Sequence, residues 1–353
     1  MSIRILSASD VRAALPMSKA IDAMRPAYGQ LSAGTAVAPP RQHISTDKGV
    51  TLIMPAYLPE RSELGIKVVS VYDDNPNFDL PRITATVLVL DPETGSPKAF
   101  MDGASLTAIR TGAGGGLAAD LLARQDAKTV GLFGAGVQAR AQLQAVMAVR
   151  DIARVNLISR TRASAEQLAT EISEWVDAPE VNLVSTPQAV VEDADIVLCA
   201  TTSATPLFDG NALQPGTHIT AVGTFVPEKR EVDTTTIRRA HRIVVDSREA
   251  CLEEAGELII PNAEIRTEHL VAVGSRQSVV GKKAESRKPT KNELVFGSAE
   301  IGEIVNGDKQ GRQSDDEITF FKSVGVAVQD AVAAAAVLAE AEAKALGTLI
   351  EIG

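Results

Sequence analysis

The chain has 353 residues, 45% of them hydrophobic and 23% charged, a composition typical of globular proteins and long enough for two domains with separate cores. A net charge of -10 and an aromatic content of 3% argue against a nucleic-acid surface, which needs basic patches and stacking rings. The first residues lack signal-peptide features and no uncharged run of 18 apolar residues occurs, so we expect a cytoplasmic protein outside the membrane.

The first third of the chain predicts short helices followed by a β-rich region. Helical patterns reach about residue 32, and apolar runs separated by Asp, Asn, Pro and Gly turns then predict short strands. These runs cover residues 41–45, 51–54, 65–72, 83–90 and 97–101. We expect them to form a largely antiparallel sheet.

A long helix is predicted over residues 105–124, although it contains Gly112 and Gly114–Gly116. Each glycine inside a helix costs roughly 1 kcal/mol relative to alanine. Such a cost indicates close packing, or the close approach of a ligand, at this surface of the helix.

The most informative segment follows, where an apolar run at 130–133 meets the sequence GAGVQA and then a helical pattern. This order of strand, glycine turn and helix is typical of dinucleotide-binding units, in which the pyrophosphate lies at the helix N-terminus. The candidate phosphate-binding residues are Gly134, Ala135, Gly136, Val137 and Gln138.

The end of the next strand indicates which dinucleotide is preferred. NAD enzymes usually place an acidic residue here to bind the ribose 2′-hydroxyl. This chain has Ser159, Arg160, Thr161 and Arg162 instead. A guanidinium group can donate two parallel hydrogen bonds to phosphate oxygens, so the sequence predicts a preference for NADP(H). NAD(H) remains possible.

Strands and helices continue to alternate along the rest of the chain. Further strands are predicted at 155–159, 181–185, 196–200, 218–222 and 242–246, which indicates an α/β fold with a Rossmann-type doubly wound parallel sheet. Residues 281–292 predict an exposed loop, and 324–346 predict an amphipathic packing helix that returns to the first domain. We therefore predict a discontinuous, mostly antiparallel α+β substrate and dimerisation domain at 1–118 and 320–353, around an NAD(P)-binding domain at 119–319.

Cysteine and histidine usage predicts neither disulfides nor a metal site. The two cysteines are too few for a disulfide framework, and Cys199 lies in a strand-like run that favours a buried structural thiol. The four histidines, His43, His218, His241 and His269, are scattered without ligand spacing.

Four motifs together resemble the ornithine cyclodeaminase/mu-crystallin family. They are GIK at 65–67, DGASLTAIRTG at 102–112, GAGVQA at 134–139 and EITFFKSVGVAVQD at 317–330. The resemblance runs essentially from end to end and implies a homodimer joined through the β-rich domains, acting on α-amino or α-imino acids. It also implies that Arg41, Lys67 and Arg110 hold the substrate carboxylate, with Lys67 able to protonate the imine nitrogen.

The resemblance further implies which residues edge the nicotinamide. The corresponding positions are Thr201, Thr202, Ser203, Val222 and Gly223, and a returning segment with Ser323 and Gly325 would close the site. The adjacent Glu253 and Glu254 are a possible acid or water-ordering pair, but their pattern favours a solvated helix face.

Two departures from the family pattern point to the substrate. Cyclodeaminases and archaeal-type alanine dehydrogenases carry Asp in a G-x-D-x-P loop, where this chain has Phe225. Cyclodeaminases also hold the distal amine of the substrate with a Glu, and the corresponding position in this chain is Leu52, shortly before Met54. A buried ammonium without a carboxylate partner is costly, so both changes favour a carboxylate attached to an apolar ring.

The sequence therefore predicts NADPH-dependent reduction of Δ1-pyrroline-2-carboxylate or Δ1-piperideine-2-carboxylate to L-proline or L-pipecolate, as in ketimine reductases related to this family. Three alternatives stay open: an ornithine cyclodeaminase that recycles NAD, an alanine dehydrogenase-like reductive aminase, and a non-catalytic mu-crystallin-like protein that binds NADP(H). Small molecules, and neither nucleic acid nor membrane, are the expected partners.

Overall fold

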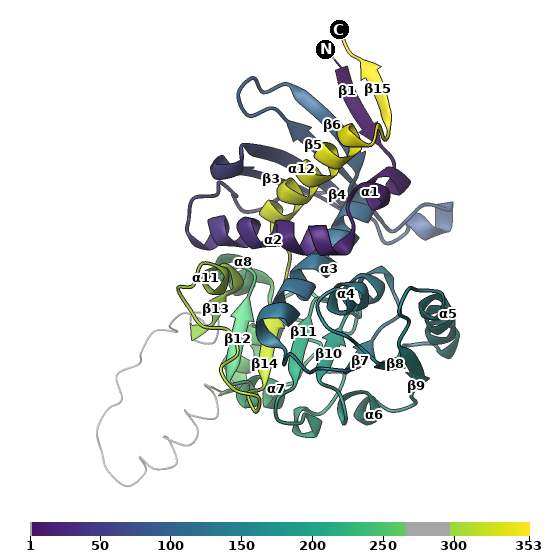
Figure 1. The fold of residues 1–353 in the computed structure, drawn as a ribbon, viewed down its shortest axis with the longest axis vertical. Helices are drawn as coiled ribbons and strands as arrows, with labels where there is room; N and C mark the ends of the chain where they lie inside the picture. Colours follow the sequence, from purple (N-terminus) through teal and green to yellow (C-terminus); the bar gives the residue numbers. More distant parts are fainter. Residues whose placement is uncertain (1, 266–296) are drawn as a thin grey trace, which may run out of the picture.

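The computed structural model describes residues 2–265 and 297–353, which form two β-sheets with helices packed against each (Figure 1). One sheet has the strand order β15-β1-β6-β5-β4-β3-β2, and the other has the order β13-β12-β14-β11-β10-β7-β8-β9. We call the two parts of the molecule the mixed-sheet unit and the parallel-sheet unit.

The mixed-sheet unit contains the predicted antiparallel region. Its strands are β1 (Ser2–Leu6), β2 (Gln42–Ser45), β3 (Val50–Leu58), β4 (Glu63–Val71), β5 (Ile83–Leu90), β6 (Pro97–Asp102) and β15 (Thr348–Glu351). All neighbouring pairs are antiparallel except β1 with β6. The sequence reading missed β1 and β15, which bring the two ends of the chain side by side through the pair Ser2 and Glu351 (Figure 1).

Helices pack on one face of this sheet and form the larger core. They are α1 (Ala8–Ala14), α2 (Met17–Ser32) and α12 (Ala327–Ala343), the last of which crosses in front of β3, β4 and β5 (Figure 1). Inward-facing residues such as Met54, Val87 and Met101 alternate with outward-facing ones along each strand, as expected for a sheet covered on one face. The helix predicted at 324–346 is thus confirmed, and it returns to the mixed sheet.

The parallel-sheet unit confirms the predicted doubly wound α/β fold, because every strand pair in it is parallel. Its strands are β7 (Thr129–Phe133), β8 (Arg154–Ile158), β9 (Glu180–Leu183), β10 (Ile196–Cys199), β11 (His218–Ala221), β12 (Arg242–Val245), β13 (Ala299–Glu300) and β14 (Thr319–Lys322). The sequence reading missed β13 and β14.

Helices cover both faces of the parallel sheet. The helices after the first strands are α4 (Val137–Met147), α5 (Arg162–Ser173) and α6 (Pro187–Val191), and the later ones are α7 (Thr234–Arg239), α8 (Arg248–Glu254) and α11 (Ile301–Val305). One core lies under α4 and α5, and another lies between the sheet and α6, α7 and α8. Cys199 and Cys251 are both buried free thiols.

Helix α3 (Gly103–Leu122) joins the two units, and its glycines confirm the predicted close packing. A Cβ on Gly112 would lie 2.6 Å from the carbonyl oxygen of Ala141, and one on Gly115 would overlap the side chain of Gln142. Larger residues would therefore push α4 away from α3. The glycine stripe fixes the position of the dinucleotide-type helix relative to the mixed-sheet unit.

The predicted domain edges at 118/119 and 319/320 fall inside α3 and β14. We propose to move them to the ends of these elements, near residues 122 and 322, because a domain boundary inside a regular element would divide its hydrogen bonds. The loop predicted at 281–292 lies outside the described residues. Among the described residues, no helix is long and apolar enough to cross a membrane, and no group of His, Cys, Asp and Glu could hold a metal ion.

Candidate active site

The glycine turn between β7 and α4 leaves a helix N-terminus open to a ligand. Gly134 has a φ of +106°, and a Cβ there would lie 2.6 Å from the carbonyl oxygen of Ala200. Gly136 caps α4 without a side-chain hydrogen bond, and a Cβ on it would meet no atom within 4 Å. Val137 in the first turn is 63% exposed. The first backbone N–H groups of α4 can therefore donate to an anion such as a pyrophosphate.

The end of β8 carries the residues predicted to choose the dinucleotide. Thr161 is the N-cap of α5 and accepts a hydrogen bond from the backbone of Ser164, and Arg162 forms an ion pair with Glu166 at 3.0 Å. Ser159 is half-buried, whereas Arg160 is exposed. Arg160 is thus the guanidinium at this strand end whose side chain is available to an incoming phosphate.

The three predicted carboxylate-binding residues come from different elements and meet at the junction of the two units. Arg41 precedes β2, Lys67 lies in β4 and Arg110 lies in α3. We call them the cation cluster. They influence one another, because Arg110 and Arg41 both lower the pKa of Lys67. They lie near the carboxyl ends of β12 and β14, where open α/β sheets bind ligands.

Asp330, in the first turn of α12, bridges two members of the cation cluster. Its Oδ2 lies 2.7 Å from Nζ of Lys67, and its Oδ1 lies 3.0 Å from Nε of Arg110. Arg110 also donates from Nη1 to Oε1 of Gln329 at 3.0 Å. The sequence reading placed Asp330 in a family motif without giving it a role.

The charges of this pair respond to burial and to each other. Burial, together with the positive charge of Arg110, lowers the pKa of Lys67 to about 8, against the opposing effect of Asp330. Burial alone would raise the pKa of Asp330, but Arg110 and Lys67 lower it overall. Lys67 is therefore a largely protonated ammonium at pH 7 that can lose its proton at a modest cost.

Arg41 contacts the parallel-sheet unit at two points. Its Nε lies 3.2 Å from Oε1 of Glu254 in α8, and its Nη2 donates to the carbonyl oxygen of Gly325 at 2.6 Å. The Glu254 side chain is only 17% exposed. The expectation of a solvated helix face is therefore wrong for Glu254, because α8 packs it toward the mixed-sheet unit, although it holds for the exposed Glu253.

The returning segment after β14 lies against the cation cluster. Asp246 accepts hydrogen bonds from the hydroxyl of Ser323 at 2.7 Å and from the backbone N–H of Gly325 at 2.7 Å. Gly325 has a φ of +84°, and a Cβ on it would lie 2.8 Å from Nη1 of Arg110. Ser323 and Gly325, which are predicted to close the cofactor site, thus lie between Asp246 and the guanidinium groups of Arg41 and Arg110.

An apolar wall lies beside Lys67. Leu52 and Met54 are 6% and 4% exposed on the inner face of β3, and Met54 pairs directly with Lys67 across β3 and β4. Phe225 follows the carboxyl end of β11 and is 45% exposed. Neither position 52 nor position 225 supplies a carboxylate for a substrate amine.

A buried polar network fixes the loops predicted to edge the nicotinamide. Glu231 accepts from the backbone N–H of Thr201 at 2.6 Å, from its hydroxyl at 2.7 Å, and from the backbone N–H of Gly223 at 2.8 Å. Lys322 lies 2.8 Å from Glu257 and donates to the carbonyl oxygen of Thr224 at 2.6 Å. Thr202 is exposed, while Ser203 and Val222 are half-buried. The sequence analysis missed these buried charges. Lys322 and Glu257 each interrupt an apolar run, which can indicate a buried charge, whereas Glu231 stands among other charged residues and gives no such sign.

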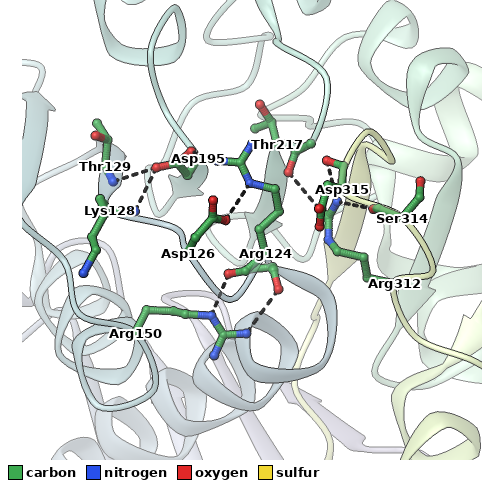
Figure 2. A network of polar contacts seen from close by, with 12 residues as sticks. Arg124, Asp126, Lys128, Thr129, Arg150, Asp195, Thr217, Arg312, Ser314 and Asp315 are labelled. Atoms are coloured by element: carbon green, nitrogen blue, oxygen red, sulfur yellow. Dashed lines mark hydrogen bonds and ion pairs between the residues drawn. The ribbon is translucent and has the colours of Figure 1, made fainter.

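Charged residues also gather at the opposite, amino-terminal edge of the parallel sheet. Figure 2 shows Arg124 between Asp126 and Asp195, with Arg150 and Arg312 nearby. Two hollows of about 320 and 460 Å³ lie here, and neither is lined by a residue of the predicted site. Because these charged side chains pair with one another and with backbone carbonyl oxygens, their contacts stabilise the fold at this edge of the sheet.

The two-unit architecture, with an open glycine turn and a cation cluster at the junction, defines a Rossmann-type protein with a second, sheet-based unit. The chain belongs to the ornithine cyclodeaminase/mu-crystallin family, whose family model matches residues 1–345.

Individual members of the family and solved structures show which proteins this chain is similar to. The chain is 36% identical over 349 residues to a Δ1-pyrroline-2-carboxylate reductase of Bacillus cereus, covering 98% of this chain and 99% of that one. The Thermococcus litoralis Δ1-pyrroline-2-carboxylate reductase, solved with NADH and L-proline, matches with a TM-score of 0.86 and 36% identity over 98% and 99% of the two chains. An archaeal alanine dehydrogenase dimer with bound NAD matches with a TM-score of 0.83 and 31% identity over the full length of both chains.

Proposed function

We propose that this protein reduces a cyclic α-imino acid, Δ1-pyrroline-2-carboxylate or Δ1-piperideine-2-carboxylate, to L-proline or L-pipecolate. The observation that carries this proposal is the cation cluster beside an apolar wall that lacks an acidic partner for a second amine. Two relatives support it: the Bacillus cereus protein is named for this reduction, and the Thermococcus litoralis reductase was solved with NADH and L-proline.

The cation cluster would bind and orient the substrate. Arg41 and Arg110 would hold the carboxylate, since a guanidinium donates two parallel hydrogen bonds to it. Asp330 keeps Arg110 and Lys67 in place through its two oxygens. Lys67 would donate a hydrogen bond, and then a proton, to the imine nitrogen, which its pKa of about 8 allows near neutral pH. Leu52 and Met54 would exclude water from the apolar ring.

The chain's own residues fit a nicotinamide dinucleotide, which when bound supplies a hydride to the imine carbon. The open N-terminus of α4 would take the pyrophosphate, and the loops held by Glu231 would edge the nicotinamide. The loop geometry matters because the reacting atoms must come within about 3–3.5 Å of each other.

We further propose that NADPH is preferred over NADH, because Arg160 is exposed at the end of β8 where an acidic residue would favour NADH. Replacing Arg160 by Ser should lower kcat/KM for NADPH by about tenfold, because one charge-assisted contact to the phosphate is lost. The value of kcat/KM for NADH should stay the same. Arg154→Ser, at the exposed start of the same strand, is the matched control. Equal turnover of both dinucleotides by the unaltered protein would reject the preference.

We also propose a homodimer formed through the uncovered face of the mixed sheet. Pro55, Ile66, Leu88 and Phe100 pair across four neighbouring strands on that face, and Phe100 is 42% exposed. A row of this kind is typical of an interface. Light scattering of the wild-type protein and of Phe100→Glu tests the dimer, which the charged side chain should dissociate.

The experiment that tests the reaction is a spectrophotometric assay of NADPH and NADH oxidation with both cyclic imines. Parallel reactions contain L-ornithine, or pyruvate with ammonia. Oxidation with a cyclic imine is the expected result. Ammonia release from L-ornithine without net cofactor change would establish a cyclodeaminase instead, and cofactor binding without any turnover would establish a binding protein.

A further inference from the structure

The two carboxylates that neutralise the cation cluster are bound in different ways. Asp330 contacts Lys67 and Arg110 with separate oxygens, and its side chain is 2% exposed. Glu254 contacts only Arg41, through Oε1, and its buried Oε2 has no hydrogen-bond partner among the described residues. Asp330 is therefore fixed in the site, whereas Glu254 is attached by one contact.

The charge balance leaves room for one more anion. Three cations face two carboxylates in the ionised cluster, an excess of one positive charge that attracts a substrate carboxylate. If Glu254 binds a proton as that carboxylate arrives, the same excess is kept. An arriving carboxylate on Arg41 would lie beside Glu254. Two carboxylates that share a site repel each other, and this repulsion raises the pKa of one of them.

The surroundings of Glu254 already favour its protonated form. Burial raises the pKa of Glu254 to about 7, and the negative charges of Asp246, at the end of β12, and Glu253 act in the same direction. Arg41 and, more weakly, Lys322 on β14 oppose them. When Arg41 turns to another anion, its stabilising effect on the ionised Glu254 is lost.

We propose that Glu254 is a displaceable counter-ion: the substrate carboxylate takes its place on Arg41, and Glu254 binds a proton as the substrate enters. The inference rests on the proposed function, since it takes Arg41 as a ligand of the substrate carboxylate. Until the substrate arrives, Glu254 keeps the Arg41 guanidinium oriented across the junction between the two units.

Proton uptake gives this exchange a measurable signature. An enzyme that gains a proton on binding loses affinity as the pH rises, by up to about tenfold per pH unit once the free carboxylate is fully ionised. Affinity should therefore be nearly constant below pH 6 and fall above pH 7.

The test is isothermal titration of pyrrole-2-carboxylate, a flat carboxylate without a titratable amine, into the protein saturated with reduced dinucleotide. Titrations at pH 7.5 in buffers with different ionisation enthalpies give the number of protons exchanged. We expect uptake of roughly 0.5–1 proton in the wild-type protein. The variant Glu254→Gln keeps a side chain able to accept from Arg41. Its uptake should fall to about 0.2 proton, the share that Lys67 contributes at this pH with its pKa of about 8, and its affinity should change by no more than about twofold between pH 6 and 8.

Glu253→Gln is the matched control, because Glu253 is exposed on the same helix and contributes only its charge to the raised pKa of Glu254, so the proton uptake should persist in this variant. Binding to the wild-type protein without proton uptake, or uptake in Glu254→Gln that stays at the wild-type level, would overturn the role of Glu254 and leave the reductase function standing. Absence of binding, together with no reduction of either cyclic imine, would overturn both.

Discussion

Two arginines, one within helix α3 and one packed against its C-terminal end, have equal burial and different surroundings. Arg110 in α3 and Arg150 beside the end of α3 are each 5% exposed. Arg110 contacts the side chains of Gln329 and Asp330, which belong to the other end of the chain. Arg150 donates to the backbone carbonyl oxygens of Ala119, Asp120, Ala123 and Arg124, and so closes the C-terminus of α3. Figure 2 shows Arg150 beside Arg124 at this end of the helix.

The difference separates an arginine that keeps a donor for a ligand from one whose donors all serve the fold. The donors of Arg150 are used on carbonyl groups that the end of a helix leaves unsatisfied. Nη2 of Arg110 has no hydrogen bond to any described residue, so it remains free for a ligand. Burial and residue type are the same, and only the partners show which arginine can take part in chemistry.

The largest effect should come from Arg110→Lys. Lysine can still pair with Asp330, but it cannot also donate to Gln329 and to a substrate carboxylate in a planar fork. We expect kcat/KM for the cyclic imine to fall about 100–1000-fold, the range for losing one partner of a buried charged contact. The thermal midpoint should change little. Near-normal turnover in this variant would remove Arg110 from the site.

The reverse pattern is expected for Arg150→Lys. Lysine cannot reach the four carbonyl groups that Arg150 now satisfies, and buried unpaired carbonyl groups are costly. The free energy of unfolding should fall by about 2–4 kcal/mol, measured by denaturant titration. kcat/KM should stay within about twofold of wild type, since Arg150 lies far along α3 from the cation cluster. A large loss of activity in a folded Arg150→Lys protein would contradict the comparison.

The amino-terminal edge should also determine acid stability, through His218. This side chain is fully buried between the hydroxyl groups of Thr319 and Thr220, and burial, with the charges of Arg312 and Arg150, lowers its pKa to about 3. The unfolded chain binds a proton at His218 near pH 6.5 and the folded chain does not. Stability should therefore be lost as the pH falls from 6.5 toward 3, by up to about 1.4 kcal/mol per pH unit. Unfolding curves of His218→Gln should show a shallower dependence.

The smallest effect should appear at the cation cluster at high pH. Lys67 has a pKa of about 8, so its ammonium is present below pH 8 and is lost above it. In a Glu254→Gln background, which removes the other titration, the affinity for pyrrole-2-carboxylate should fall above pH 8 by at most about tenfold per unit. Adding Lys67→Arg should abolish this decline. A decline that survives the arginine substitution would show that another group titrates.

More of the fold than of the candidate site could be predicted from the sequence. Local patterns predicted the strands and helices that repeat along the parallel sheet, including the turn at Gly134, because each depends on neighbouring residues. Strands β1 and β15 were missed, since each is short and is stabilised by a partner at the other end of the chain. The roles of Glu231, Glu257 and Lys322 were missed for the same reason: a buried charge is explained only by the partner that it meets.

The sequence by itself determined the dinucleotide-type turn and the alternation of strands and helices, and the family resemblance predicted Arg41, Lys67 and Arg110 as ligands of the substrate carboxylate. Only the tertiary structure decided that Asp330 and Glu254 neutralise these cations, and that Glu254 is the one held by a single contact. The physical reason is that backbone conformation follows local periodicity, whereas the state of a charge depends on burial and on neighbours that folding brings from distant parts of the chain.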